Sequence, residues 1–401
     1  MADLDVARAP EEAPIERRAL RWGALLGIVG LLLCLLGAFI APRQAAHSYL
    51  AAYVAWLTLA LGALLMVMIA HAIGTSWFVP MRRIAESVAA TLPLFALLFI
   101  PILIALPELY PWARPLDTLA EPLREAVEGK HGYFGLGFFI GRAVLYFVIW
   151  IVTSSLLHAW SVRRDSRPAD AALEHRQRVL AAVALPPVGF ALTFAAFDWV
   201  MSLAPEWVST MFGVYLFIGG MVSALALLSV LLLGLDRAGV LGDAVTVSHY
   251  HALGKLLLTF VIFWGYIAYA QYFIIWIADI PAEAGWYAPR VRGSWGGIAL
   301  VLVLGHFALP FLLLLSWQLK RRPRALAAVG AWLVLMHCFD AYWLVLPALY
   351  PAGVSVSWLD FAAFIGVGAL AFAFGTWRYL AHAPVPFGDP RWQAAQEFTT
   401  R

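Results

Sequence analysis

Ionisable side chains inside long apolar segments are the residues of this chain that could carry chemistry. Asp198 lies near the end of one such segment, in the stretch AAFDWVMSLAPEW at 195–207, and Asp340 lies in another. A charged side chain at the centre of a bilayer costs roughly 2.5 to 3.5 kcal/mol on insertion scales, so it is rare there unless it is paired, hydrated or functional. Carboxylates at this depth are typical of proton relays, and these two positions predict proton transfer.

Each carboxylate has a basic residue that we expect at a similar depth. Arg142 comes about two turns into the apolar segment that precedes Asp198. In the same way His306 precedes Asp340, and His337 lies about one turn from Asp340 on the same helical face. We therefore expect one basic and acidic couple in each half of the molecule. A structural ion pair that pins two helices is the alternative to a proton site for Arg142 and Asp198.

A second layer of ionisable residues lies near helix ends that we expect to face the cytoplasm. It comprises His71, Glu86, His251 and Lys255. Charges near an interface cost little, because long side chains reach the headgroup region. Solvated helix ends and the entrance of a proton pathway therefore both remain open for this layer.

The composition places these residues in a membrane protein. Of all residues 63% are hydrophobic and only 13% are charged, and the mean hydropathy is +0.82. Soluble domains carry about 25% charged residues. The sequence predicts an all-α polytopic fold with ten membrane-spanning helices, each about 20 residues long or more. They are expected at 22–41, 49–72, 84–106, 134–160, 179–203, 210–233, 255–277, 296–319, 325–349 and 357–380.

The Lys and Arg residues predict the orientation. Of the 27, 20 lie on one side of the ten expected helices and 7 on the other. Because short cytoplasmic loops carry the excess, the tails at 1–21 and 381–401 are both expected in the cytoplasm. The net charge of +3 reflects this topology and not an affinity for nucleic acid. The longest break, from Pro107 to about Tyr133, is expected to be a folded surface loop with short helical pieces.

An internal repeat organises the expected helices. The stretch GRAVLYF at 141–147 matches GHFALPF at 305–311, and RVLAAVA at 178–184 matches RALAAVG at 324–330. Two parallel-repeat four-helix bundles are therefore expected, at about 49–203 and 210–349, with the first and last helices outside them. A chance similarity among Ala/Leu/Val-rich helices is the alternative.

Cofactor motifs are missing from the sequence. Cys34 and Cys338 are isolated, with no spacing typical of a disulfide, zinc, iron–sulfur or c-type haem site. No helix carries two histidines about thirteen residues apart, the spacing typical of a di-haem bundle, although His306 and His337 could together ligate one haem. A transporter or a purely structural scaffold remains an alternative class, but no Gly/Pro break recurs in matching positions of the two halves.

Three stretches resemble a known family. They are FDWVMSLAPEWVSTMFGVYLFIGG at 197–220, FVPMRRIAES at 78–87 and FDAYWLVLPALYP at 339–351. They are similar to the NrfD-like, or polysulfide-reductase-C-like, integral membrane proteins, and specifically to the cofactor-free member of the two found in bacterial alternative complex III. The similarity runs over essentially all ten expected helices. The family often has an acidic residue before the proline of the first stretch and a histidine after it, where Ala204 and Glu206 stand here.

The resemblance implies a membrane component of a quinol:cytochrome c, or quinol:electron-acceptor, oxidoreductase in the bacterial cytoplasmic membrane. Implied partners are the paralogous NrfD-like protein of the same complex, an iron–sulfur protein, multihaem cytochromes c and a terminal oxidase. Haem c and iron–sulfur clusters would lie in these partners, with none bound by this chain, and a bound quinone or quinol is left open. A paralogous quinol-binding NrfD-like protein and an ion- or proton-coupled transporter are the alternatives.

The resemblance also implies roles for single residues. Asp198 would be the carboxylate that exchanges protons with the outer side, and Arg142 would be its partner at the same depth. Arg83 and Glu86 would form the cytoplasmic entrance of the proton pathway. The relay of the second bundle would comprise His306, His337 and Asp340.

Overall fold

The computed structural model describes residues 14–168 and 170–400, and these residues form helices and no strand. Ten helical segments in this part of the chain are long and apolar enough to cross a membrane, which confirms the predicted all-α polytopic fold. Six of the ten are single helices: α1 (Pro14–Ile40), α2 (Pro42–Ile73), α9 (Leu136–Asp165), α11 (Phe212–Arg237), α12 (Val247–Ala278) and α18 (Trp358–Leu380). The ninth, α17 (Pro323–Val345), continues into a 3₁₀ turn at Leu346–Ala348.

The fifth spanning segment, α10 (Ala171–Trp199), ends in a short 3₁₀ turn, and two others are interrupted at prolines. The third segment is split into α3 (Val79–Ala89), α4 (Leu92–Leu98) and α5 (Ile100–Ile104), with Pro93 and Pro101 in the first turns of α4 and α5. The eighth consists of α14 (Gly293–Leu302), a π-helical turn at Val303–Ala308 and α15 (Leu309–Leu315), in which Pro310 follows the π-turn. Proline removes a backbone donor and clashes with the preceding turn, which accounts for these interruptions.

Most helices extend beyond the predicted bounds. For example, α2 begins at Pro42 instead of residue 49, and α12 begins at Val247 instead of residue 255. The apolar pattern marks only the part of a helix within the hydrocarbon, whereas the backbone continues to form hydrogen bonds through the polar interface. Residues 14–21, predicted as part of a tail, already belong to α1, and residues 1–13 lie outside the described residues.

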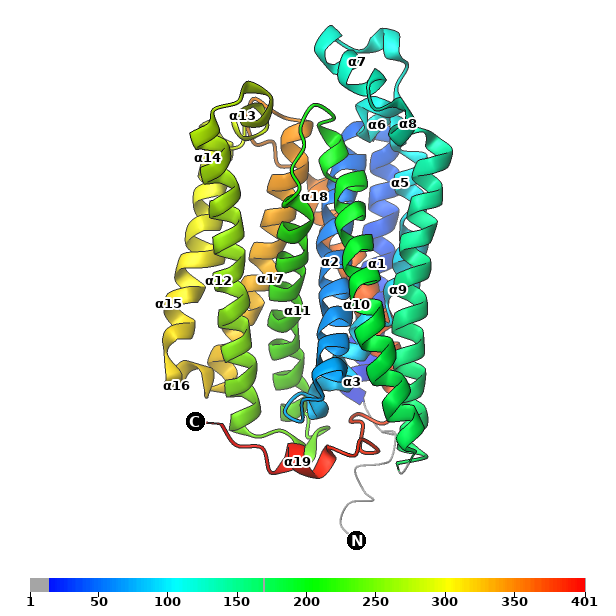
Figure 1. The fold of residues 1–401 in the computed structure, drawn as a ribbon, viewed down its shortest axis with the longest axis vertical. Coiled ribbons are helices and arrows are strands. Elements are labelled where there is room, and N and C mark those ends of the chain that lie inside the picture. Colours follow the sequence, from blue (N-terminus) through cyan, green and yellow to red (C-terminus); the bar gives the residue numbers. More distant parts are fainter. Residues whose placement is uncertain (1–13, 169, 401) are drawn as a thin grey trace.

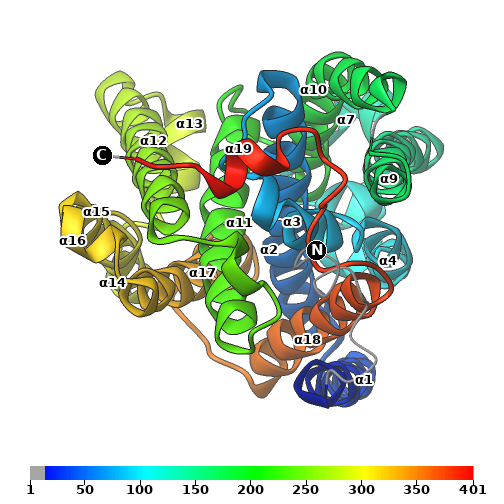
Figure 2. The ribbon, with the colours of Figure 1, turned by 90° about the horizontal axis from the view of Figure 1, so that it is seen from below.

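The spanning helices form two groups of four with a peripheral pair (Figure 2). The first group holds α2, α3 to α5, α9 and α10, and the second holds α11, α12, α14 to α15 and α17. The groups meet where α2 packs on α11; in addition α10 contacts α11, and α17 contacts α2. The last helix of each group therefore rests on the first helix of the other, as parallel repeats require. Outside both groups, α1 pairs with α18, which covers α2 and α3.

Glycines allow the two groups to approach closely. A Cβ atom on Gly62 of α2 would collide with the backbone of Gly220 on α11, and one on Gly220 would collide with the carbonyl of Thr58. Such close backbone contacts between small residues drive helix association in membranes. The hydrophobic effect does not drive it there, because the lipid tails are as apolar as the side chains. The α2–α11 crossing is thus the centre of the membrane domain.

The two ends of the molecule differ (Figure 1). One end, which we call the loop end, carries α6 (Leu106–Leu109), α7 (Glu121–Glu128), α8 (His131–Phe134) and α13 (Pro281–Tyr287). The other, which we call the terminal end, is where α1 begins and where the chain runs after α18. There residues 384–400, with α19 (Trp392–Gln396), cross beneath α3 and α11 toward α12 (Figure 2). We call this segment the C-terminal strap.

Candidate proton-transfer sites

Asp198, near the loop end of α10, accepts four hydrogen bonds. Arg142 of α9 donates from Nε to Oδ2 at 2.8 Å and from Nη2 to Oδ1 at 2.9 Å. Tyr133 donates to Oδ1 at 2.7 Å, and Tyr146 donates to Oδ2 at 2.8 Å. The predicted contact of Arg142 and Asp198 is therefore present, and it is a bidentate pair, the geometry that adds most energy and specificity to a guanidinium–carboxylate contact.

The surroundings of Arg142 hold this pair in place. Its Nη1 donates to the backbone oxygen of Tyr133 at 3.0 Å, and its guanidinium stacks over the rings of Tyr133 and Phe138 at 3.9 and 4.3 Å. Burial and the hydrogen bond to Asp198 raise the pKa of Tyr133, so this hydroxyl keeps its proton and remains a donor. A proton can reach either oxygen of Asp198 only by displacing one of these four donors.

Asp340, on α17 of the second group, has a different environment. Its side chain is buried, and Tyr215 of α11 donates to its Oδ1 at 2.5 Å. Among the described residues no Lys, Arg or His lies within ion-pair distance of this carboxylate. The two carboxylates that the predicted repeat aligns therefore have different surroundings: Asp198 accepts from four donors, whereas Asp340 accepts from few.

His337 links the two groups of helices. Its Nε2 lies 3.0 Å from Oγ1 of Thr58 and 3.1 Å from the backbone oxygen of Ala55, both on α2. A backbone oxygen can only accept, so we assign the proton of the neutral ring to Nε2. The basic atom is then Nδ1, which is buried and makes no hydrogen bond to a described residue. His337 lies beside Gly219, which Asp340 also approaches, so the two side chains share one face of α17 as predicted.

The predicted couple of His306 with Asp340 does not form. The ring of His306 is fully buried and stacks on Trp264 of α12, with 4.1 Å between centroids, and neither ring nitrogen has a hydrogen-bond partner among the described residues. His306 lies in the π-helical turn before Pro310. A π-turn holds more residues than an α-turn and so changes the direction of the side chains it carries. This turn brings the His306 ring against Trp264 of α12, from where it interacts electrostatically with His337 of α17 but makes no ion pair with Asp340.

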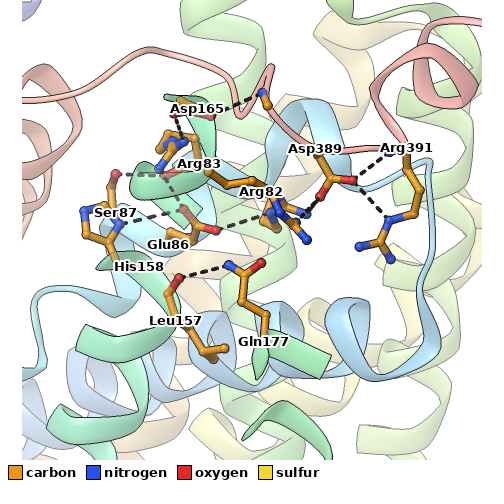
Figure 3. A network of polar contacts seen from close by, with 12 residues as sticks. Arg82, Arg83, Glu86, Ser87, Leu157, His158, Asp165, Gln177, Asp389 and Arg391 are labelled. Atoms are coloured by element: carbon orange, nitrogen blue, oxygen red, sulfur yellow. Dashed lines mark hydrogen bonds and ion pairs between the residues drawn. The ribbon is translucent and has the colours of Figure 1, made fainter. Parts of the chain in front are cut away.

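At the terminal end, Glu86 of α3 is the centre of a buried cluster (Figure 3). Its Oε2 lies 3.3 Å from Nη1 of Arg83 and 3.7 Å from Nδ1 of His158, and its Oε1 lies 3.2 Å from Nε of Arg82. Arg83 and Glu86 therefore lie together, as the resemblance implies. Arg82 and His158 join them without having been predicted.

The cluster extends to the C-terminal strap. Arg82 donates to Asp389 of the strap at 2.6 Å, as do Arg164 and Arg391 at 3.1 Å. Burial alone would raise the pKa of Asp389, but the Arg82 and Arg391 guanidiniums outweigh it and hold the pKa well below its ordinary value. The carboxylate is therefore ionised, and its negative charge compensates the positive charges of these arginines. On the other side Arg83 donates to Asp165 at 2.5 Å.

Three other predicted residues of the second layer lie in different settings. His251 of α12 is buried, with its ring 6.0 Å from that of Trp317 between centroids. His71, at the end of α2, is buried, interacts electrostatically with Arg82 and Glu86, and has no hydrogen-bond partner on Nε2 among the described residues. Lys255 is exposed on α12 and donates to Oγ1 of Thr400 in the strap at 2.6 Å. His71 thus belongs to the cluster, whereas Lys255 lies outside it and helps to hold the strap.

Sequence reasoning missed six residues of this cluster: Asp165, His158, Arg82, Arg164, Asp389 and Arg391. The first two stand in helix ends that resemble any charged interface. The strap offered a signal, since Val385, Phe387 and Trp392 place large apolar side chains around Asp389 in a segment that follows the last spanning helix. Val385 is fully buried, which anchors the strap beside the cluster.

A small apolar cavity lies between the cluster and the central residues. It measures about 10 Å³ and is lined by Ala63, Met66, Ala85, Val88, Ala224, Leu225 and Leu228 of α2, α3 and α11. This volume is at the lower limit for one water molecule, and the lining side chains offer such a molecule no hydrogen-bond partner. The arrangement therefore places polar groups at two depths, with an apolar constriction between them along α2.

No protein-family model matches this chain, and no curated protein is similar to it at the level that the comparison requires. Its family is therefore a proposal that rests on the sequence resemblance and on the site geometry. The described residues contain no group of three or more His, Cys, Asp or Glu side chains that could hold a metal ion. The expectation that this chain binds no cofactor stays a prediction.

Proposed function

We propose that this chain is the proton-conducting membrane component of a quinol-oxidising respiratory complex, with Asp340 as its proton-exchanging carboxyl group. The observation that carries the proposal is the surroundings of Asp340, which is buried and has Tyr215 as its hydrogen-bond donor and no cation within ion-pair distance among the described residues. An ionised carboxylate buried without a partner costs several kcal/mol, and such a group is neutralised by taking up a proton.

The pathway in this proposal runs from the terminal end to the middle of the membrane domain. Protons enter at the terminal end, which the Lys and Arg distribution predicts to face the cytoplasm, through the cluster around Glu86, where His71 and His158 have ring nitrogens without a hydrogen-bond partner among the described residues. The small apolar cavity beside Ala85 lies between this cluster and the central Thr58 and His337, and it would be the constriction of the pathway. The free Nδ1 of His337 then exchanges with Asp340 along the shared face of α17.

Asp198 has a different role in this proposal. The resemblance implies outer proton exchange at Asp198, but its four donors favour a permanent ion pair with Arg142. The pair fixes α9 to α10 near the loop end, where Tyr133 of α8 also donates. We therefore assign it to positioning of the first group of helices.

The complex itself is proposed from the resemblance. Its redox groups, haem c and iron–sulfur clusters, would lie in partner proteins on the outer face, next to the paralogous NrfD-like protein. The location is then the bacterial cytoplasmic membrane, with both termini cytoplasmic.

The proposal is tested in the complex purified with this chain and reconstituted in liposomes. Asp340→Asn is expected to leave quinol oxidation measurable but to lower the number of protons moved per electron, because an amide cannot exchange a proton. The control is the double variant Asp198→Asn with Arg142→Gln, which removes the loop-end pair without leaving a buried charge. We expect wild-type stoichiometry in this control. Wild-type stoichiometry in Asp340→Asn would contradict the proposal.

A further inference from the structure

Positive charge gathers at the terminal end of the second group of helices. Lys255 lies on α12, and Lys320 and Arg321 lie at the end of α16 (Trp317–Lys320), a single turn between α15 and α17 (Figure 1). None of the three makes an ion pair with a described Asp or Glu residue. By contrast, the arginines around Glu86 have carboxylate partners. We call Lys255, Lys320 and Arg321 the basic cluster.

Close packing of α16 on α12 brings the basic cluster together. The stem of Lys320 lies against Gly254 of α12, where a Cβ atom would come within 2.8 Å of the lysine Cγ. The chain can turn back at this point because Ser316 caps α16 and Pro323 begins α17. All three cations act electrostatically on His251, which lies one turn before Lys255 on α12. Cations from two chain segments therefore meet beside one face of α12.

Lys320 carries a buried charge. It is only 6% exposed, and its ammonium group donates to the backbone oxygens of Leu314 and Leu315 at the end of α15. These oxygens satisfy its hydrogen bonds, but they carry no full negative charge. Lys255 adds electrostatic repulsion. Buried ions are ordinarily paired, so an anion from outside the chain would complete this site.

The basic cluster lies at the membrane interface. Lys255 stands where the predicted apolar part of α12 begins, and Trp317 follows shortly after the end of α15. The Trp317 ring is exposed, and the guanidinium of Arg321 lies over it at 4.6 Å. Trp, Lys and Arg at helix ends are typical anchors at the level of the lipid headgroups. Toward the middle of the membrane, the exposed Leu312 and Leu315 of α15 offer an apolar surface to acyl chains.

We propose that the basic cluster binds the phosphate group of an anionic phospholipid, with the acyl chains along α15. Basic pockets between spanning helices are known to take such headgroups. A lipid with a choline headgroup has the same phosphate, but its cation would stand beside three cations of the protein and weaken binding. A soluble phosphate ion shares the chemistry of the headgroup, but it gains nothing from the exposed leucines. The charge and the apolar surface together therefore favour a lipid.

This inference goes beyond the proposed function and does not depend on it, because it uses only the membrane location and the charges of one end. The test is native mass spectrometry of the purified full-length chain, titrated with phosphatidylglycerol or with phosphatidylcholine of the same acyl chains. We expect the first phosphatidylglycerol molecule to bind about tenfold more tightly than phosphatidylcholine. Higher salt should reduce this difference, since it screens exposed charges.

Variants assign the preference to the basic cluster. Lys255→Gln with Arg321→Gln removes two charges and is expected to lower the phosphatidylglycerol affinity about tenfold, to the level of phosphatidylcholine. Lys255→Arg with Arg321→Lys keeps both charges and should retain the preference. If the first double variant does not fold, as judged by size-exclusion chromatography, the single variant Arg321→Gln takes its place.

The matched control removes two charges elsewhere at the same end of the molecule. Arg163, near the end of α9, and Arg167, directly after it, are exposed and make no ion pair with a described residue. Arg163→Gln with Arg167→Gln therefore changes the net charge by the same amount. We expect this variant to bind phosphatidylglycerol as the wild type does.

Four results would overturn the inference. One is equal affinity of the wild type for the two lipids. Another is unchanged phosphatidylglycerol affinity in the folded Lys255→Gln and Arg321→Gln variant. A third is equal loss of affinity in the Arg163 and Arg167 control, which would show a general effect of surface charge. The last is displacement of the bound lipid by inorganic phosphate but not by chloride at the same ionic strength, which would show a site for a soluble anion.

Discussion

Asp198 and Asp340 take matching places in the two groups of helices, but the protein surrounds them differently. Asp198 is held by Arg142 and by the hydroxyls of Tyr133 and Tyr146. Asp340 has the Tyr215 hydroxyl and no cation within ion-pair distance among the described residues. In our proposal the same residue type therefore has a structural role in the first group of helices and exchanges protons in the second.

The basic partner decides between these outcomes. Arg142 stays charged and presents two parallel donors to Asp198, which makes a fixed pair. The corresponding residue of the second half is His306, and it turns away to stack on Trp264. Loss of a permanent cation is thus what separates the two carboxylates.

The largest effect is expected from a variant that breaks the ion pair of Arg142 with Asp198. Arg142→Gln leaves Asp198 as an uncompensated buried charge, and removal of one partner of a buried ion pair costs about 3 to 5 kcal/mol. We expect the variant to be lost from the membrane or to unfold at a clearly lower temperature, measured by fluorescence-detected size-exclusion chromatography during heating. Adding Asp198→Asn should restore most of the stability. Equal stability of the single variant and the wild type would refute the structural role.

Smaller effects are expected when the tyrosines that donate to the two carboxylates are replaced. Tyr146→Phe removes one of four donors from Asp198, and we expect a loss of about 1 kcal/mol in the free energy of unfolding with normal proton movement. Tyr215→Phe removes the hydroxyl that donates to Asp340 and is expected to slow proton movement more than it lowers stability. Both quantities are measured on the same preparations. The opposite ranking, with Tyr146→Phe slower in proton movement, would reverse the assignment.

The smallest expected effect concerns Asp389, a paired carboxylate outside the spanning helices. Burial raises its pKa, but Arg82 and Arg391 hold the pKa well below the ordinary value of roughly 3.9. Its contribution to strap binding is therefore fully present above that ordinary value and is lost as the pH falls through the lower pKa of the folded protein. Hydrogen exchange of residues 384–400, corrected for intrinsic rates, should stay protected from about pH 8 to about pH 5.

Two variants test whether Asp389 causes this protection. Asp389→Asn should increase exchange in the strap already at neutral pH, because Arg82 and Arg164 lose a charged partner. Glu397→Gln, in the same segment, removes a carboxylate that takes part in no ion pair with a described residue and should change little. Loss of wild-type protection between about pH 6 and about pH 5 would contradict the pairing, since an ordinary Asp is still ionised there.

The sequence predicted the ten spanning helices and the meeting of Arg142 with Asp198, because apolar length and repeat position determine both. It could not predict the direction of His306, which depends on one π-helical turn before Pro310. Nor could it place Asp389 beside Arg82, since a contact across about three hundred residues leaves no local pattern. A cleft of about 670 Å³ between α12 and α14 could not be predicted either. Its lining comes from five helices, and the aromatic residues of each helix alone resemble interface anchors.

The protonation state of Asp340 tests the central claim most directly. Infrared difference spectroscopy of the purified chain, recorded across a pH change, detects the carbonyl stretch of a protonated carboxylic acid inside a protein. We predict that Asp340→Asn removes this band and that Asp198→Asn combined with Arg142→Gln leaves it in place. A band that persists in Asp340→Asn and disappears in the loop-end double variant would contradict the account and return proton exchange to Asp198.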